Sequence, residues 1–134
     1  MDELSEEALK YIGSDLVALY DSTVPSYAAM LEMMGMGAHV NSNFPKAQAA
    51  KDATMAHFIL KNWSEGQLFF HYNGAYHSND FEGIVWWINK LKPGLNIQTI
   101  ATTQQTQLDS LETVNMDVAN FVVVVPENMT MTNR

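Results

Sequence analysis

The stretch from His71 to His77 concentrates side chains that could bind a metal or a cofactor. Two imidazoles, two phenols (Tyr72 and Tyr76) and a glycine, Gly74, lie within it. Neutral imidazole is a common ligand of zinc, iron and copper, and either His or Tyr can be axial to haem iron. The glycine lets the backbone turn tightly or approach a ligand closely. We therefore predict a binding site formed by these five residues.

Each of these side chains also has a structural interpretation. His71 falls inside a predicted strand, where packing and a hydrogen bond would account for it. His77 lies past the glycine on a loop, the better position for a functional residue. Tyr72 and Tyr76 could equally be amphipathic packing residues. Two histidines six residues apart are no established metal signature, so the spacing alone leaves both interpretations open.

Asp52 is the second candidate, on the same predicted helix as Met55 and at the border of its apolar stripe. A carboxylate buried there without a partner would cost stability. We expect its partner to be the ring N–H of His77 or His71, which it would orient as a supporting residue. The alternative is a partly exposed acid that pairs with Lys51 or Lys61 of the same helix.

Composition excludes several classes of protein. The net charge is −8 with only seven Lys and Arg residues, too few to replace the counterions of a nucleic acid. The chain has no cysteine, which rules out disulfides, thiolate nucleophiles and Cys-ligated metals. Hydrophobic residues make up 47% and charged residues 16%, which indicates a globular chain of one domain.

The sequence lacks the patterns expected of a membrane span and of a secretory signal. No stretch approaches the roughly 20 apolar residues of a membrane span. The first residues are acidic and lack the basic-then-apolar pattern of a secretory signal. We expect neither a transmembrane segment nor a signal in this chain, and a signal could precede it in a longer native protein.

Helices predominate in the first half of the predicted structure. A helix from Pro45 to Trp63 is predicted by one continuous apolar stripe, and shorter helices are predicted over 4–12, 14–20 and 27–34. The methionines around Met33 have the helical spacing of core residues. The members of the longer stripe are Ala49, Ala53, Ala56, Leu60 and Trp63.

The second half alternates strands and a helix. Strands are predicted over 67–72, 95–101 and 121–125, and the last is a continuous β-branched run typical of a strand buried on both faces. A helix over 81–91 separates the first two strands, and Asn79 and Glu82 fit a capping box at its start. The polar segment 102–112 has room for a short helix.

Alternating strands and helices predict an α/β fold with a small parallel, or mostly parallel, sheet flanked by helices. The whole chain, 1–134, would be one domain fragment, with a helical segment over 1–63 and a strand–helix–strand–strand segment over 64–126. His71 to His77 would then lie at the carboxyl edge of the sheet, where open α/β folds bind ligands. So small a sheet has exposed edges, so we expect it to be part of a larger domain.

Two segments together resemble the C-terminal half of ChaN-like haem-binding uptake proteins, within the Tiki, TraB and erythromycin-esterase-like superfamily. The first is Ala47-Gln48 followed by Lys51-Asp52-Ala53-Thr54-Met55-Ala56. The second is His71-Tyr72-Asn73-Gly74-Ala75-Tyr76-His77-Ser78 followed by Gly83-Ile84. The resemblance runs from about Gln48 to Val125. Gly74-Ala75-Tyr76-His77 corresponds to the superfamily's second Gly-x-x-His motif.

The resemblance implies that His77 is a site residue and that Asp52 supports the same pocket. It also implies haem or iron acquisition at the cell envelope, by lipoprotein-related proteins facing the periplasm. The superfamily's first motif, Gly-Glu-x-His, does not occur in the sequence, and the chain has about half the family's expected length. We therefore expect a fragment or a short form of a family member.

Three hypotheses for function follow. In the first, the chain is not an enzyme: His77, Tyr76, His71 or Tyr72 near Gly74 binds haem, and two chains could pair as a homodimer. In the second, it is a divalent-metal or His-assisted hydrolase in which His77 binds metal or acts as general base and Asp52 orients it. In the third, it is a fragment without a ligand of its own. The missing first motif counts against the hydrolase.

Overall fold

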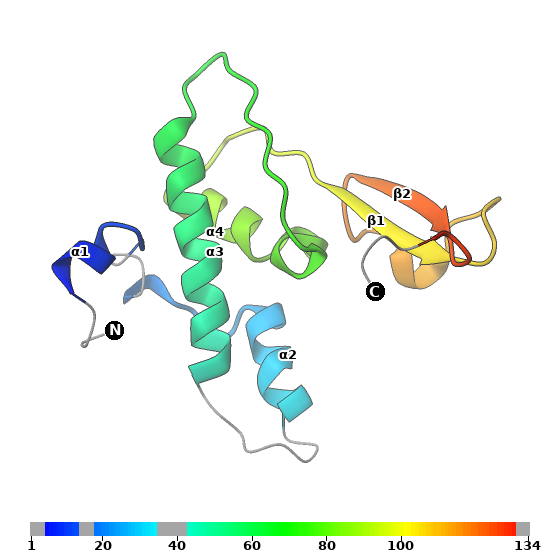
Figure 1. The fold of residues 1–134 in the computed structure, drawn as a ribbon, viewed down its shortest axis with the longest axis horizontal. Helices are drawn as coiled ribbons and strands as arrows, with labels where there is room; N and C mark the ends of the chain where they lie inside the picture. Colours follow the sequence, from blue (N-terminus) through cyan, green and yellow to red (C-terminus); the bar gives the residue numbers. More distant parts are fainter. Residues whose placement is uncertain (1–4, 14–17, 35–42, 131–134) are drawn as a thin grey trace.

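The computed structural model describes residues 5–13, 18–34 and 43–130 (Figure 1). Much of the predicted helix over 14–20 lies outside the described residues. Within them, no helix is both long and apolar enough to cross a membrane. The helices are α1 (Glu6–Leu9), α2 (Pro25–Met34), α3 (Asn43–Asn62) and α4 (Ile84–Leu91), and the strands are β1 (Ile100–Gln105) and β2 (Phe121–Pro126).

The long helix α3 is the centre of the fold, and α2 and α4 both pack against it (Figure 1). It begins at Asn43, which places Pro45 in the first turn, where its missing N–H leaves no hydrogen bond unmade. The predicted stripe is confirmed at Ala49, Ala53 and Ala56, all fully buried. Alanines allow close approach between helices, and the core that covers them consists of Val24, Tyr27, Ile84, Trp87 and Ile88.

The start of α4 differs from the prediction. A short 3-10 helix, Asn79–Phe81, precedes it, and no side chain caps α4, so the predicted capping box is wrong. The Glu82 carboxylate instead accepts a hydrogen bond of 2.6 Å from the backbone N–H of Ser26, in the first turn of α2. A carboxylate there satisfies a free N–H and complements the helix dipole. Glu82 therefore ties α4 to α2.

The strand predicted over 67–72 is wrong. These residues have no regular secondary structure, and Leu68 and Tyr72 are 91% and 87% exposed. Aromatic residues favour strands only where a neighbouring strand supplies hydrogen bonds and packing. Here β1 and β2 pair with each other, and no strand among the described residues pairs with 67–72.

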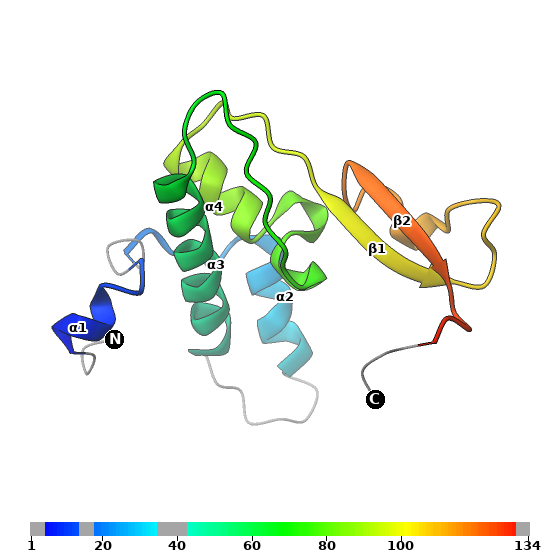
Figure 2. The same cartoon turned by 45° about the horizontal axis from the view of Figure 1, so that its top comes forward.

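The sheet consists of β1 and β2, paired in parallel with Ile100 opposite Phe121. The strand predicted over 95–101 begins later, at Ile100, and takes part of the segment where we expected a short helix. The expected burial of β2 on both faces is wrong, since Phe121 and Val123 are 58% and 48% exposed. In both views the sheet and α1 lie at opposite ends of the molecule (Figure 2).

Helices with a small parallel sheet confirm the predicted α/β class, with two strands rather than three. The segment with His77 therefore does not lie at the carboxyl edge of a strand. It follows the irregular segment after α3 and leads into α4. Helices, rather than the sheet, position the candidate site.

Candidate functional site

A relay of hydrogen bonds runs through the core between the three packed helices. The Trp87 indole N–H of α4 donates to the Tyr27 hydroxyl of α2 over 3.0 Å. That hydroxyl donates to Oδ2 of Asp52, on α3, over 2.7 Å. All three side chains are fully buried, and Asp52 has no exposed surface. The carboxylate therefore has a donor at one oxygen and keeps the other for a second partner.

That second partner is His77, whose Nδ1 lies 2.5 Å from Oδ1 of Asp52. The predicted pairing of Asp52 with His77 is thus present in the geometry. The Gln48 amide Nε2 lies 2.8 Å from the same Nδ1, and a single ring nitrogen cannot accept from Gln48 and donate to Asp52 at once. A hydrogen bond to an ionised acceptor is about twice as strong as a neutral one. We therefore assign Nδ1 as the donor, and in a neutral imidazole the lone pair is then on Nε2.

Burial dominates the electrostatics of the relay. Removal from water raises the pKa of Asp52 above its usual range, and the hydrogen bonds from His77 and Tyr27 oppose that rise. Burial, with the neighbouring Asp52 carboxylate, also raises the pKa of Tyr27 far above its usual value. Tyr27 therefore remains a protonated donor under all ordinary conditions. The two hydrogen bonds of the relay therefore point the same way: Trp87 donates to Tyr27, and Tyr27 donates to the Asp52 carboxylate.

The backbone around His77 is fixed by a glycine other than the predicted one. Gly74 has an ordinary extended conformation, with φ −67° and ψ 146°, so it makes no use of glycine's freedom. Gly83 has φ 53°, and a Cβ on it would lie 2.4 Å from the His77 carbonyl oxygen. Only glycine fits there. The close approach of Gly83 holds the short 3-10 helix Ala75–His77 against the start of α4.

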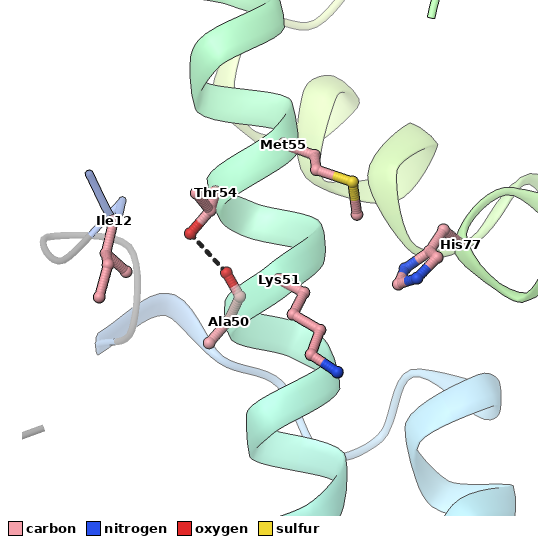
Figure 3. A pocket seen from close by; sticks show the side chains of 6 residues that line it. All are labelled: Ile12, Ala50, Lys51, Thr54, Met55 and His77. Atoms are coloured by element: carbon pink, nitrogen blue, oxygen red, sulfur yellow. Dashed lines mark hydrogen bonds between the residues drawn. The ribbon is translucent and has the colours of Figure 1, made fainter. Parts of the chain in front are cut away.

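His77 faces an open hollow of about 480 Å³ on the surface of α3 (Figure 3). Drug-sized ligands typically occupy pockets of roughly 300–1,000 Å³. Figure 3 shows Met55 and Lys51 extending from α3 toward the side on which His77 lies. The predicted supporting residue Met55 is therefore beside His77. The lining consists of Ile12, Ala50, Lys51, Thr54, Met55 and His77.

Three other predicted site residues, Tyr76, Tyr72 and His71, do not line the hollow that His77 faces. Tyr76 is half-exposed and lines a second hollow, together with Ser26 of α2. The Tyr72 ring is largely exposed and contacts Phe70 at 5.1 Å between ring centres. His71 is exposed in the irregular segment and lines neither hollow. Of the predicted residues, the geometry brings together His77, Asp52 and Met55, and the Gly74 carbonyl accepts a hydrogen bond of 2.9 Å from the His77 N–H.

Sequence reasoning missed Tyr27 and Trp87 as determinants of this site, and it gave no role to Gln48 and Gly83, which it had noted only in the segments that resemble the family. Tyr27 and Trp87 had one available signal, since a buried hydroxyl or indole N–H needs a hydrogen-bond partner. That signal does not identify the partner, which for Tyr27 lies 25 residues away.

For metals, the described part of the chain has no group of three or more His, Asp or Glu side chains that could hold an ion.

Comparison with known proteins bears on this site. The model of a family described as haem-binding uptake, Tiki superfamily, ChaN, matches residues 1–88. The match covers the relay and His77, includes the segment before Gln48, and ends short of the predicted limit at Val125. No curated protein and no solved structure matches the chain. Since the match covers 88 of 134 residues, the chain belongs to the ChaN family of haem-binding uptake proteins of the Tiki superfamily.

Proposed function

We propose that this chain binds haem and that Nε2 of His77 is the ligand to the iron. The observation that carries the proposal is the contact of 2.5 Å between Nδ1 of His77 and Oδ1 of buried Asp52, which orients the imidazole ring. A metal-binding histidine typically donates its other ring N–H to a carboxylate or carbonyl, which fixes the tautomer and raises the basicity of the ligand. Histidine is a common axial ligand of haem iron.

The surroundings of His77 fit such a ligand. Haem is a flat and mostly apolar ring, and the hollow beside His77 is lined largely by the aliphatic and thioether groups of Ile12, Ala50 and Met55. A bound haem would be held by His77 at the iron and by these side chains at the ring. As a member of an uptake family, the chain would act in haem or iron acquisition at the cell envelope.

A haemin titration followed by absorbance tests the proposal. We expect saturable binding with a Soret band, lost or weakened at least tenfold in His77→Ala. His71→Ala is the matched control, because it removes an exposed imidazole six residues away and should leave the affinity unchanged. Asp52→Asn keeps the shape of the side chain but removes the charge that fixes His77, and should weaken binding about 10- to 100-fold.

Two results would contradict this assignment. Equal affinities for the wild type and His77→Ala would remove His77 as the ligand, and a loss in Tyr76→Phe would transfer that role to Tyr76. A wild-type chain without saturable binding would end the haem proposal. Circular dichroism of each variant distinguishes a lost ligand from a lost fold.

A second candidate is a His-assisted hydrolase, because Asp52 and His77 have the geometry of an oriented general base. Thr54, which lines the same hollow as His77, has a hydroxyl that is already engaged. It donates to the Ala50 carbonyl over 2.6 Å and accepts from the Gly13 N–H over 3.2 Å. The attacking group would therefore be water. Ester cleavage that needs His77 and not His71, with or without added divalent metal, would support this candidate.

A further inference from the structure

The hollow beside His77 has one charged lining residue, Lys51, among the residues that the structure describes. Lys51 precedes the relay residue Asp52 on α3 and lies one turn before Met55, so that Lys51 and Met55 share a face of the helix. Figure 3 shows its ammonium group extended toward the side of α3 on which His77 lies. A positive charge thus lies at the border of an otherwise nearly apolar surface.

The Lys51 charge acts electrostatically on Asp52, where it opposes the rise in the pKa of the carboxyl group that burial causes, but it forms no salt bridge among the described residues. The salt bridges found among described residues are Lys10 with Glu7 and His77 with Asp52, and neither uses Lys51. The Lys51 side chain is exposed, as expected where an aliphatic stem lies along an apolar wall and the ammonium stays at the water boundary. The whole chain carries a net charge of −8 and repels anions at long range. A cation at the hollow therefore gives an anionic ligand a local partner.

We propose that Lys51 determines specificity by binding a carboxylate of the ligand, so that the hollow selects a flat apolar ring with acid groups at its edge. The proposal rests on the proposed function. Haem has this chemistry, since two propionate groups project from one edge of the ring. In this arrangement His77 binds the iron, Met55 contacts the ring, and Lys51 pairs with one propionate.

Titrations of the full chain with haemin and with haemin dimethyl ester test this role. The ester keeps the ring and the iron but has no free carboxylate. Lys51→Met keeps most of the stem and removes the charge, and Lys46→Met is the control, an exposed lysine of the same helix that does not line the hollow. We expect Lys51→Met to weaken haemin binding about threefold to tenfold, the range of a partly exposed to charge-assisted pair.

The same variant should bind the ester as the wild type does, and the wild type should prefer haemin to the ester by a similar ratio. Lys46→Met should behave as the wild type with both ligands. If Lys51→Met weakens both ligands equally, or neither, Lys51 does not bind the carboxylate and the haem proposal stands without it. If neither ligand saturates the wild type, the proposed function fails and this role fails with it.

Discussion

Asp52 is a carboxylate without exposed surface, and each of its oxygens meets a different donor. Burying a charge is unfavourable unless it is hydrogen-bonded, and removing one partner leaves the other group unsatisfied. The arrangement therefore constrains three helices and the His77 loop together. A change anywhere along the relay should affect the orientation of His77 as well as stability.

The Tyr27 hydroxyl should contribute measurably to the free energy of unfolding. Tyr27→Phe keeps the ring that fills the core, but leaves Oδ2 of Asp52 and the Trp87 indole N–H without their partner. We expect a loss of about 1–3 kcal/mol, measured by urea denaturation. Tyr11→Phe removes an exposed hydroxyl and should change stability by less than about 0.5 kcal/mol. Equal effects of the two substitutions would show that the relay adds nothing to stability.

At the residue scale, the sequence predicted that Asp52 could contact a histidine, His77 or His71, and the structure places His77 there; the binding role of His77 stays a prediction. The residue types identify groups that need partners, and the family motif indicates which of them share a pocket. The sequence was insufficient for Tyr27 and Gln48. Their roles depend on how α2 and α3 pack, and no local pattern encodes the distance between a tyrosine and an aspartate 25 residues away.

At the scale of elements, the short 3-10 helix Ala75–His77 is held in place by backbone contact with Gly83. This contact determines where the His77 ring meets α3. It also explains how an irregular segment after α3 can place one side chain reproducibly, since the following helix begins against it. Gly83 therefore positions His77 without itself lining the hollow.

Gly83→Ala should destabilise the chain more than Gly94→Ala does. Both glycines have positive φ, so both substitutions carry backbone strain of about 1–3 kcal/mol. Gly94 has open space where a Cβ would stand, whereas at Gly83 the Cβ would meet the His77 carbonyl oxygen. We expect an additional loss at Gly83 of at least about 1 kcal/mol, within the range for overpacking, together with weaker haemin binding.

Thermal denaturation and haemin titration of the two variants provide the comparison. Similar melting temperatures and similar haemin affinities for both would contradict the positioning role of Gly83.

The sequence pattern was sufficient to predict some helices and strands and insufficient for others. The predicted stripe, Ala49 to Trp63, covers about four turns of helix and packs against α2 and α4, so periodicity alone predicted it. The segment 67–72 has the composition of a strand and is not one, because a strand requires a partner that the sequence does not specify. The Glu82 carboxylate caps α2 rather than its own helix, which depends on tertiary placement.

At the scale of the whole molecule, the helices hold the site and the sheet lies apart from it (Figure 2). The two parts are linked by 92–99 and by a hydrogen bond of 2.9 Å from the Asp80 N–H to the Val118 carbonyl. The fold class could be predicted from the alternation of patterns. The number of strands and the exposed face of the sheet could not be predicted. A β-branched run indicates a strand but does not show which other elements pack against it.

Stability should depend on pH through Asp52. Its pKa is higher in the folded chain than in the unfolded chain, so the folded state binds the proton more tightly. The Asp52 contribution to stability is therefore complete at pH values below its ordinary pKa of 3.8 and decreases as pH rises through the raised pKa. Other carboxylates contribute as well, so the difference between the wild type and Asp52→Asn isolates this term.

Urea denaturation of both proteins from about pH 4 to about pH 7 measures that difference. We expect the stability of the wild type relative to Asp52→Asn to fall with rising pH and then level off. A relative stability that rises over the same range would mean that the hydrogen bonds to Asp52 outweigh its burial.

The relay ends at an indole, which gives the molecule an optical property. Trp87 is one of three tryptophans, and its N–H bonds to Tyr27 in a site without contact with solvent. Indole emission responds to hydrogen bonding and to polarity, so the Trp87 part of the fluorescence of this chain reports on the relay before any ligand is added. The residue farthest along the relay from the hollow is thus an intrinsic probe of whether His77 is held in place.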